Sequence, residues 1–156
     1  MFLLKVASLL NKRKIPYAIA GGYAMALHGI VRATMDVDLV LNLKKDDFIK
    51  FSEAMKEISL LSRLPVLPAQ VIDFRKEYIK QRNLIAWSFV NYKDPSEVVD
   101  VLIVEDLAKI KTIKMTVGDI KISVVSLKDL VRMKENSGRA QDLLDLENLK
   151  KLSKEK

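Results

Sequence analysis

The sequence has 156 residues, of which 49% are hydrophobic and 30% are charged, values typical of a soluble globular chain that forms one domain over residues 1–156. It has no cysteine and a single histidine, His28, which excludes a disulfide framework, a thiolate zinc site and a multi-histidine metal cluster. The net charge of +7 favours contact with polyanions, although lysines spread along a chain are also typical of an ordinary solvated surface.

The apolar start of the chain does not have the pattern of a targeting segment. Lys5 interrupts residues 1–10, and the basic residues 12–14 follow the apolar run, whereas a secretory signal carries its charge before it. No segment approaches the roughly 20 apolar residues that cross a bilayer. The sequence therefore predicts a cytoplasmic protein without membrane contact.

The first elements lead into a glycine turn. Apolar residues at helical spacing predict an amphipathic helix over residues 2–14, and residues 17–20 are expected to form a short strand. Gly21 and Gly22 follow, and a helix of small residues is expected to run to about Gly29. A turn from a strand into a helix directs backbone N–H groups outward, and glycine allows a phosphate to approach them closely.

Two aspartates follow in the next predicted strand. Asp36 and Asp38 are separated by one residue, so their carboxylates are expected to point to the same face, while Val37 and Leu39 point to the core. Like charges this close repel each other unless a cation lies between them. Because Mg²⁺ prefers carboxylate oxygens and retains room for substrate phosphates, the pair predicts a metal site beside a phosphate site.

Three residues between the glycines and the aspartates have alternative interpretations. His28, near a helix end, is either a structural histidine or a contact to a phosphate or leaving group. Arg32 either binds the proposed phosphate or pairs with an acidic residue at the surface. Thr34 shares the face of the aspartates if the strand already begins there, and is then a candidate to orient their carboxylates and to contact the nucleotide.

The middle of the chain is expected to be helical. Apolar residues on one stripe predict a helix over 44–62, and a second helix is predicted over 69–82. Basic side chains lie on the second helix at Arg75, Lys76, Lys80 and Arg82. This basic helix is either a solvated face or a guide for a triphosphate or an RNA backbone.

A third aspartate lies in a predicted strand. Residues 84–91 and 97–104 read as antiparallel strands joined by a turn. Asp100 interrupts the apolar run of the second strand, and a charge there is costly unless it is paired or bound to a metal. It is therefore expected to be a third metal ligand or one member of a buried salt bridge.

The end of the chain predicts a hairpin followed by two helices. Residues 113–125 alternate around Gly118, as expected for a β-hairpin. Ser126 and Asp129 have the spacing of an approximate capping box. Helices are expected over about 127–136 and 139–152, packed on the rest of the domain.

The Gly pair, thirteen further residues and then Asp36-Val37-Asp38 resemble the nucleotidyltransferase superfamily that includes DNA polymerase beta. Within it, the stretch GGYAMALHGIVRATMDVDL is most similar to the AbiEii-like branch of minimal prokaryotic and toxin-type nucleotidyltransferases. The similarity continues more weakly through Asp100 and the segment MKENSGRAQDLLDLENL.

The resemblance implies an α/β (α+β) fold, with a mixed sheet flanked by helices, and a nucleotidyltransferase activity that uses a nucleoside triphosphate such as ATP. Two Mg²⁺ or Mn²⁺ ions would be held by Asp36, Asp38 and Asp100. Lys134 would face the triphosphate, and Asp142 would orient it through an ion pair.

The acceptor expected from the resemblance is RNA such as tRNA, a protein or a small molecule. A toxin-type enzyme would also have an antitoxin partner. The alternative is a non-catalytic module that binds a nucleotide or a partner protein with the same fold.

Overall fold

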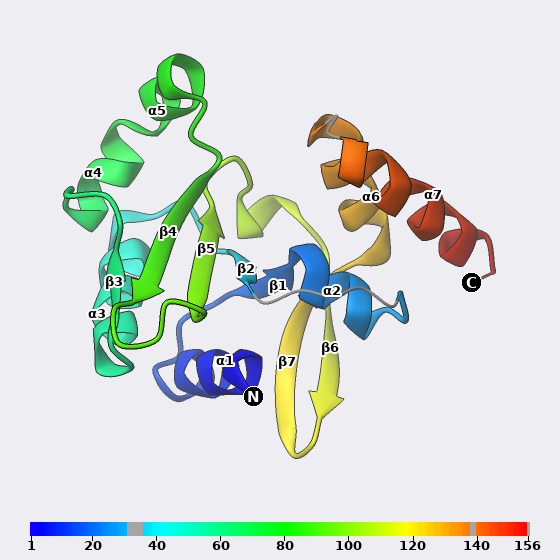
Figure 1. The fold of residues 1–156 in the computed structure, drawn as a ribbon, viewed down its shortest axis with the longest axis horizontal. Coiled ribbons are helices and arrows are strands. Elements are labelled where there is room, and N and C mark those ends of the chain that lie inside the picture. Colours follow the sequence, from blue (N-terminus) through cyan, green and yellow to red (C-terminus); the bar gives the residue numbers. More distant parts are fainter. Residues whose placement is uncertain (31–35, 138–139, 156) are drawn as a thin grey trace.

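The computed structural model describes residues 1–30, 36–137 and 140–155. In these ranges the strands form a seven-stranded sheet in the order β3-β4-β5-β2-β1-β7-β6 (Figure 1). Neighbouring strands are antiparallel, except that β1 is parallel to β7 and β2 is parallel to β5. The predicted mixed sheet is confirmed. The strands are β1 (Ala18–Ala20), β2 (Val37–Val40), β3 (Leu60–Ser62), β4 (Ala86–Asn91), β5 (Val98–Leu102), β6 (Thr112–Val117) and β7 (Ile120–Val125).

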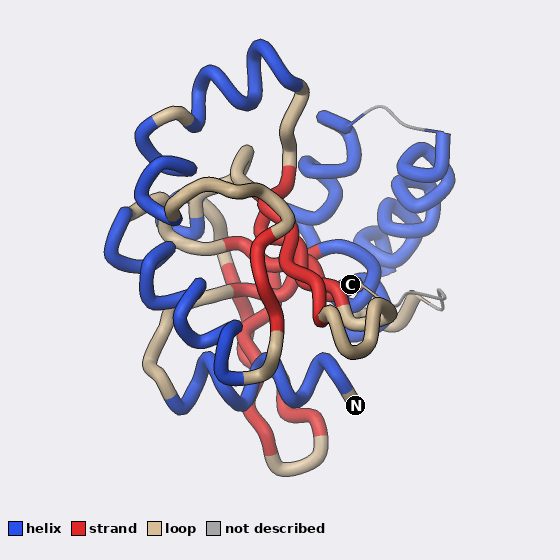
Figure 2. Tube along the Cα trace, turned by 60° about the vertical axis from the view of Figure 1, so that its left-hand side comes forward, coloured by secondary structure: helices blue, strands red, loops and turns tan. Residues whose placement is uncertain are grey.

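Helices lie on both sides of the strands, which occupy the centre of the molecule (Figure 2). Within the described ranges, no helix has the length and apolar character needed to cross a membrane. The helices are α1 (Phe2–Lys12), α2 (Gly21–Leu27), α3 (Lys45–Glu57), α4 (Pro68–Asp73), α5 (Arg75–Arg82), the 3-10 helix η1 (Leu107–Lys109), α6 (Leu127–Ser137) and α7 (Ala140–Glu155).

The main core fills the face of the sheet that α3 covers. Trp87 of β4 stacks on Phe48 of α3 with ring centroids 5.2 Å apart and an interplanar angle of 8°. Trp87 is paired in register with Val101 of β5, and Val101 is paired with Leu39 of β2, and all three are fully buried. Burying side chains of this size stabilises the fold by about 1.5–3 kcal/mol each. Since side chains alternate along a strand, their sequence neighbours face the other side of the sheet.

The predicted helix over residues 44–62 is wrong in its last part. Helix α3 ends at Glu57, Ser59 takes a left-handed φ of 67°, and the next three residues form the edge strand β3. A three-residue strand is too short to show an alternating pattern in sequence. Pairing with β4, a non-local contact, determines its conformation.

The segment predicted as one helix over 69–82 forms two. Helices α4 and α5 meet at Phe74, whose φ of −108° and ψ of 19° interrupt the helical backbone. Pro68 lies at the start of α4, where its missing N–H is tolerated.

The elements predicted at the end of the chain correspond to β6, β7, α6 and α7. The Ser126 hydroxyl accepts a hydrogen bond from the Asp129 N–H at 3.3 Å and donates one to Asp129 Oδ2 at 3.0 Å, so the expected capping interaction is present. Leu130 of α6 and Leu149 of α7 are buried in the core. Each of the two C-terminal helices therefore contributes a side chain to the core, and the single domain over residues 1–156 stays a prediction.

Candidate functional site

The turn between β1 and α2 lies directly against the Asp38 carboxylate. Ala20 and Asp38 are register partners in the antiparallel pair β1–β2. Gly21 has a φ of +60°, and a Cβ added there would collide with Asp38 Oδ2 and lie 2.8 Å from Asp38 Cγ. Both the backbone conformation and the space therefore require glycine at position 21, and the turn and the carboxylate form one surface.

Asp38, Asp100 and Ser88 form a row across three adjacent strands, called the carboxylate row below. Asp38 of β2 pairs in register with Asp100 of β5, which pairs in register with Ser88 of β4. The Ser88 hydroxyl donates a hydrogen bond of 2.5 Å to Asp100 Oδ1. Adjacent strands are about 4.8 Å apart, so the two carboxylates lie side by side on the face opposite the Trp87 core.

Asp36 lies beside this row. Strand β2 begins at Val37, so Asp36 precedes the strand by one residue and is exposed. Its pKa is raised, first by burial of the carboxyl group and then by the negative charge of Asp100, while the positive charge of Arg63 lowers it. The charges of Asp100 and Arg63 therefore both act on the Asp36 carboxyl group.

Two of the three predicted metal ligands, Asp38 and Asp100, are placed to hold a hard divalent cation. Among the described residues, no group of three or more His, Cys, Asp or Glu side chains is arranged to hold a metal ion. Mg²⁺ is, however, commonly held by one or two carboxylates, with water and substrate phosphates completing its coordination. Asp38 and Asp100 provide such a pair, and Mn²⁺ uses the same oxygen donors. The site of two ions and three carboxylates stays a prediction.

A cavity of about 420 Å³ opens beside the glycine turn and Asp38, and this size is within the range of small-molecule sites. Its walls are mostly apolar and come from the ends of β4 and β5 and from α6. Glu105 at its edge forms an ion pair of 2.7 Å with Arg132. We call this space the Gly21–Lys134 cavity; it is lined by Gly21, Asp38, Ile85, Leu102, Val104, Glu105, Leu130, Met133, Lys134 and Asn136.

Lys134 lines this cavity, and its contact to a triphosphate stays a prediction. Its Nζ lies 3.3 Å from Asp145 Oδ2, and the two side chains are only 12% and 5% exposed. The predicted partner Asp142 is in α7, but its side chain is outside the described part of the structure. Asp145 was not identified from the sequence, although it lies three residues after Asp142 and so shares one helix face with it.

His28 has the arrangement of a structural histidine. It is 7% exposed, and its Nε2 lies 2.9 Å from the Val125 carbonyl oxygen. This contact ties the end of α2 to the end of β7. The predicted phosphate residues Arg32 and Thr34 lie outside the described residues.

Two residues beside the predicted aspartates were missed by the sequence analysis. Ser88 carried a signal, because it is a polar residue within an otherwise apolar strand, as Asp100 is. Arg63 carried none, because it directly follows β3, which the sequence pattern did not predict. The backbone N–H of Arg63 donates a hydrogen bond of 2.9 Å to the Ser88 carbonyl oxygen.

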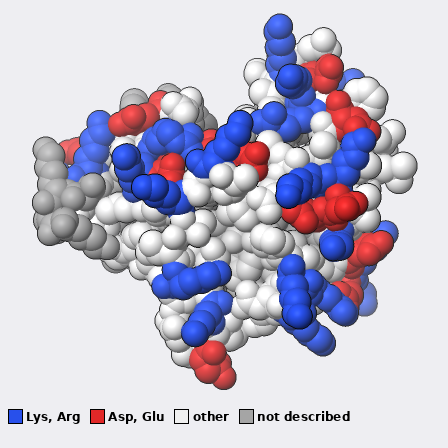
Figure 3. Space-filling model, turned by 180° about the vertical axis from the view of Figure 1, so that it is seen from behind, with Lys and Arg blue, Asp and Glu red and all other residues white. Residues whose placement is uncertain are grey.

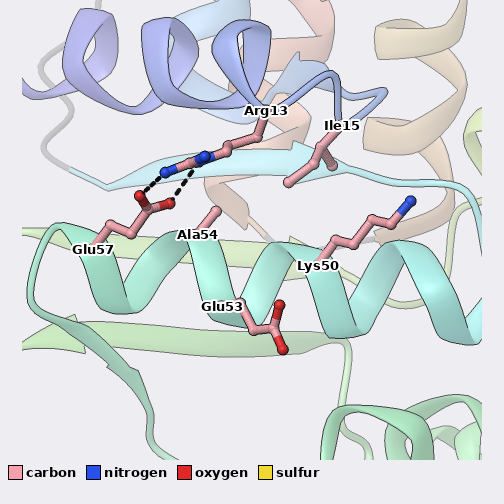
Figure 4. Close-up of a pocket in the computed structure, with 6 residues that line it drawn as sticks. All are labelled: Arg13, Ile15, Lys50, Glu53, Ala54 and Glu57. Carbon is pink, nitrogen blue, oxygen red and sulfur yellow. Dashed lines mark hydrogen bonds and ion pairs between the residues drawn. The ribbon is translucent and has the colours of Figure 1, made fainter.

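A second hollow lies between α1 and α3 (Figure 4), and no residue of the carboxylate row lines it. Arg13 and Glu57 face each other across it and form an ion pair. Ile15 and three residues of α3, Lys50, Glu53 and Ala54, complete its lining. Because Arg13 and Glu57 pair with each other here, this hollow has the character of a helix–helix contact.

Comparison with known proteins identifies the fold. No protein-family model matches the sequence, and no curated protein sequence matches it. The chain is similar to the structure of a lincosamide antibiotic adenylyltransferase, LnuA, with bound lincomycin, at 14% identity and a TM-score of 0.64, covering 97% of this chain and 96% of that one. It is also similar to the antibiotic-resistance factor ANT(2'')-Ia, at 11% identity and a TM-score of 0.63, covering 95% and 80%.

A third similar structure is an antigenic nucleotidyltransferase-like protein from Paracoccidioides brasiliensis, at 17% identity and a TM-score of 0.57, covering 93% of this chain and 72% of that one. At these identities the similarity concerns the fold. The chain therefore has the fold of the nucleotidyltransferase superfamily.

Proposed function

We propose that this protein is a nucleotidyltransferase that transfers a nucleoside monophosphate from a nucleoside triphosphate to an acceptor. The observation that carries this proposal is the pairing of Asp38 with Asp100 on adjacent strands, beside a glycine turn that contacts Asp38. A structure of ANT(2'')-Ia contains adenylyl-2''-tobramycin, so one protein with this fold carries a nucleotidylated small molecule.

In the proposed reaction, the triphosphate lies against the Gly21-Gly22 turn, and the nucleoside occupies the Gly21–Lys134 cavity. The apolar wall of the cavity covers the base, and the Lys134 ammonium group neutralises phosphate charge. Asp145 holds that ammonium group in place through the 3.3 Å ion pair. Arg32 and Thr34, also predicted from the sequence, would add phosphate contacts.

The acceptor oxygen or nitrogen attacks the α-phosphorus, and the bond between that phosphorus and the bridging oxygen breaks, so that pyrophosphate leaves. Asp100 accepts the proton that the acceptor loses, or orients the acceptor for this loss. Ser88 fixes the Asp100 carboxylate through its hydrogen bond of 2.5 Å. The products are a nucleotidyl ester or amide and pyrophosphate.

Mg²⁺ or Mn²⁺ would be held by Asp38 and Asp100, with Asp36 as the further predicted ligand. When bound, such ions neutralise phosphate charge and acidify the attacking group. An enzyme of this kind would work in the cytoplasm, where nucleoside triphosphates are available. The finer assignment to the AbiEii-like branch, with a toxin role, a tRNA or protein acceptor and an antitoxin partner, rests on the sequence pattern alone.

The substitution Asp100→Asn separates an enzyme from a binding module. It should lower transfer from labelled ATP to acceptors in total RNA or lysate by at least about 10²-fold, the low end for losing a positioned proton-transfer group. ATP binding should change by only a few fold, because Asp38, the further predicted ligand Asp36, the glycine turn and Lys134 are all unaltered. Binding is measured by calorimetry with Mg²⁺ present.

Asp94→Asn is the matched control, since Asp94 lies in the turn between β4 and β5 and its carboxylate accepts hydrogen bonds only from nearby Ser96 among the hydrogen bonds described. It should leave transfer and binding unchanged. The transfer assay is repeated with each of the four nucleoside triphosphates. A wild-type protein that binds ATP but transfers a nucleotide from none of them to any acceptor would be a non-catalytic binding module.

A further inference from the structure

The carboxylate row continues beyond Ser88 to Arg63. Strand β3 pairs with β4 so that Ser62 is opposite Phe89, which places Arg63 beside Ser88. The Ser62 hydroxyl accepts a hydrogen bond from Trp87 Nε1 at 3.0 Å, so Ser62 faces the Trp87 core. By alternation, the next residue, Arg63, faces the carboxylates.

The order of residues across the sheet gives the two ends of the site different roles. The glycine turn lies on one side of Asp38, and Asp100, Ser88 and Arg63 follow in order on the other side. Arg63 is three strand spacings, or about 14 Å, from Asp38. A triphosphate at the glycine turn and Lys134 therefore leaves the Arg63 end open to the acceptor.

The positive charge at this end is available to a ligand. Arg63 is exposed, and among the residues that the structure describes no carboxylate lies within 4.0 Å of its guanidinium group. Its charge reaches Asp36 without forming an ion pair with it. A guanidinium group so placed has its hydrogen-bond donors free for a planar or tetrahedral oxyanion.

Helix α5 adds further positive charge near the end of β5. Its first residue, Arg75, donates a hydrogen bond of 2.5 Å to the Ile103 carbonyl oxygen, which holds α5 near the end of β5. Lys76, Lys80 and Arg82 of α5 are exposed, and the projection formed by α4 and α5 carries several Lys and Arg side chains (Figure 3). Three exposed cations on one helix suit an acceptor with more than one phosphate.

We propose that Arg63 binds a phosphate group of the acceptor next to the attacked hydroxyl, and that the acceptor is a single nucleic acid strand that continues along α5. This inference rests on the proposed function and adds the class of the acceptor to it. Arg63 is a positioning residue: it holds the strand so that its terminal hydroxyl lies at Asp100. The phosphate makes charge-assisted hydrogen bonds to the guanidinium group.

The probe is a fluorescein-labelled oligoribonucleotide of about 12 nucleotides with a free 3′ hydroxyl, and its binding is measured by fluorescence anisotropy at several salt concentrations. Arg63→Gln should raise Kd by about 10-fold or more, and should reduce the slope of log K against log salt by about one. Arg63→Lys should restore part of the affinity, because it keeps the charge without the two-pronged geometry.

Lys121→Gln is the control, because Lys121 is an exposed cation on β7, on the other side of the sheet order from β3. It should change Kd by less than about twofold, as expected for a charge outside the binding path. Equal losses from Arg63→Gln and Lys121→Gln would mean that only the net charge attracts the strand, and the proposal would be wrong. Failure of the wild-type protein to bind the strand would also overturn it, and a protein or small-molecule acceptor would then remain.

ATP binding separates this proposal from the proposed function. Arg63→Gln should leave the Kd for ATP within about twofold, whereas a similar loss of ATP and strand binding would make Arg63 a triphosphate contact instead. If the wild-type protein binds the strand through Arg63 but transfers no nucleotide to it, the strand is a ligand of Arg63 but not the acceptor, and the proposal is wrong. The wild-type protein should transfer a nucleotide to the strand. In Arg63→Gln the half-saturating concentration of the strand should be raised and that of ATP unchanged. This result supports both the proposed function and the acceptor role of Arg63.

Discussion

Gly21→Ala should destabilise the protein and disable its site for two separable reasons. The first is the backbone, since a φ of +60° costs a residue with a Cβ roughly 1–2 kcal/mol. The second is the collision of the new Cβ with the Asp38 carboxylate, which must leave its rotamer at a further cost of about 0.5–1.5 kcal/mol. The free energy of unfolding should therefore fall by roughly 1.5–3.5 kcal/mol in total.

Gly118→Ala isolates the first reason from the second. Gly118 has a φ of +63°, but nothing lies within 4 Å of the Cβ that alanine would add. The loss of unfolded-state freedom on changing glycine to alanine is similar in both variants, so the difference between them measures the collision. Urea unfolding provides the free energies, and each kcal/mol should also lower Tm by about 2–4 °C in a chain of this size.

A double-mutant cycle with Asp38→Ala completes the test. Without the carboxylate, Gly21→Ala should cost no more than Gly118→Ala, so the coupling energy between positions 21 and 38 should be about 0.5–1.5 kcal/mol. Gly21→Ala should also weaken binding of ATP with Mg²⁺, whereas Gly118→Ala should not. Equal destabilisation by the two alanines, together with a coupling energy near zero, would refute the close contact between the turn and the carboxylate.

Two further substitutions test the charges of the site. Because the pKa of Asp36 is raised in the folded protein, the folded state binds the proton more tightly than the unfolded chain does, and stability is lost as the pH rises above about 3.9 and through the raised pKa. Without divalent ions, Asp36→Asn should therefore have the higher Tm at pH 7, and its advantage should shrink as the pH falls toward 4; an advantage that is independent of pH would contradict this. Asp145→Asn should lower the free energy of unfolding by about 1.5–3 kcal/mol, because it removes a charge-assisted contact of the largely buried Lys134 ammonium group. Glu147→Gln, which removes an ion pair whose side chains are 70% and 64% exposed, should cost less than about 1 kcal/mol, and equal costs would show that burial is unimportant at Asp145.

Local patterns in the sequence predicted much of this protein. Strand alternation around Val37 and Leu39 placed Asp38 on the solvent side of the sheet, and the polar interruption at Asp100 marked the neighbouring strand of the site. Helical spacing, the Gly118 turn and the Ser126 cap predicted the C-terminal hairpin and helices. Each of these signals lies within about a dozen residues, because periodicity and capping depend on neighbours along the chain.

Long-range contacts could not be predicted in the same way. The register that pairs Asp38 with Asp100 joins residues 62 positions apart, and no local pattern specifies which residue of one strand lies opposite which residue of another. The position of Arg63 depends on β3, a three-residue edge strand that exists only because β4 offers it a partner. The partner of Lys134 depends on how α6 packs on α7.

The residue types of the candidate site were thus determined by the sequence, and their arrangement by the tertiary structure. The glycine at position 21 shows both contributions. Its conformational freedom was evident from the sequence, since glycine accepts a positive φ. Its need for empty space arises only because strand pairing brings the Asp38 carboxylate against the turn, at a separation that leaves no room for a Cβ.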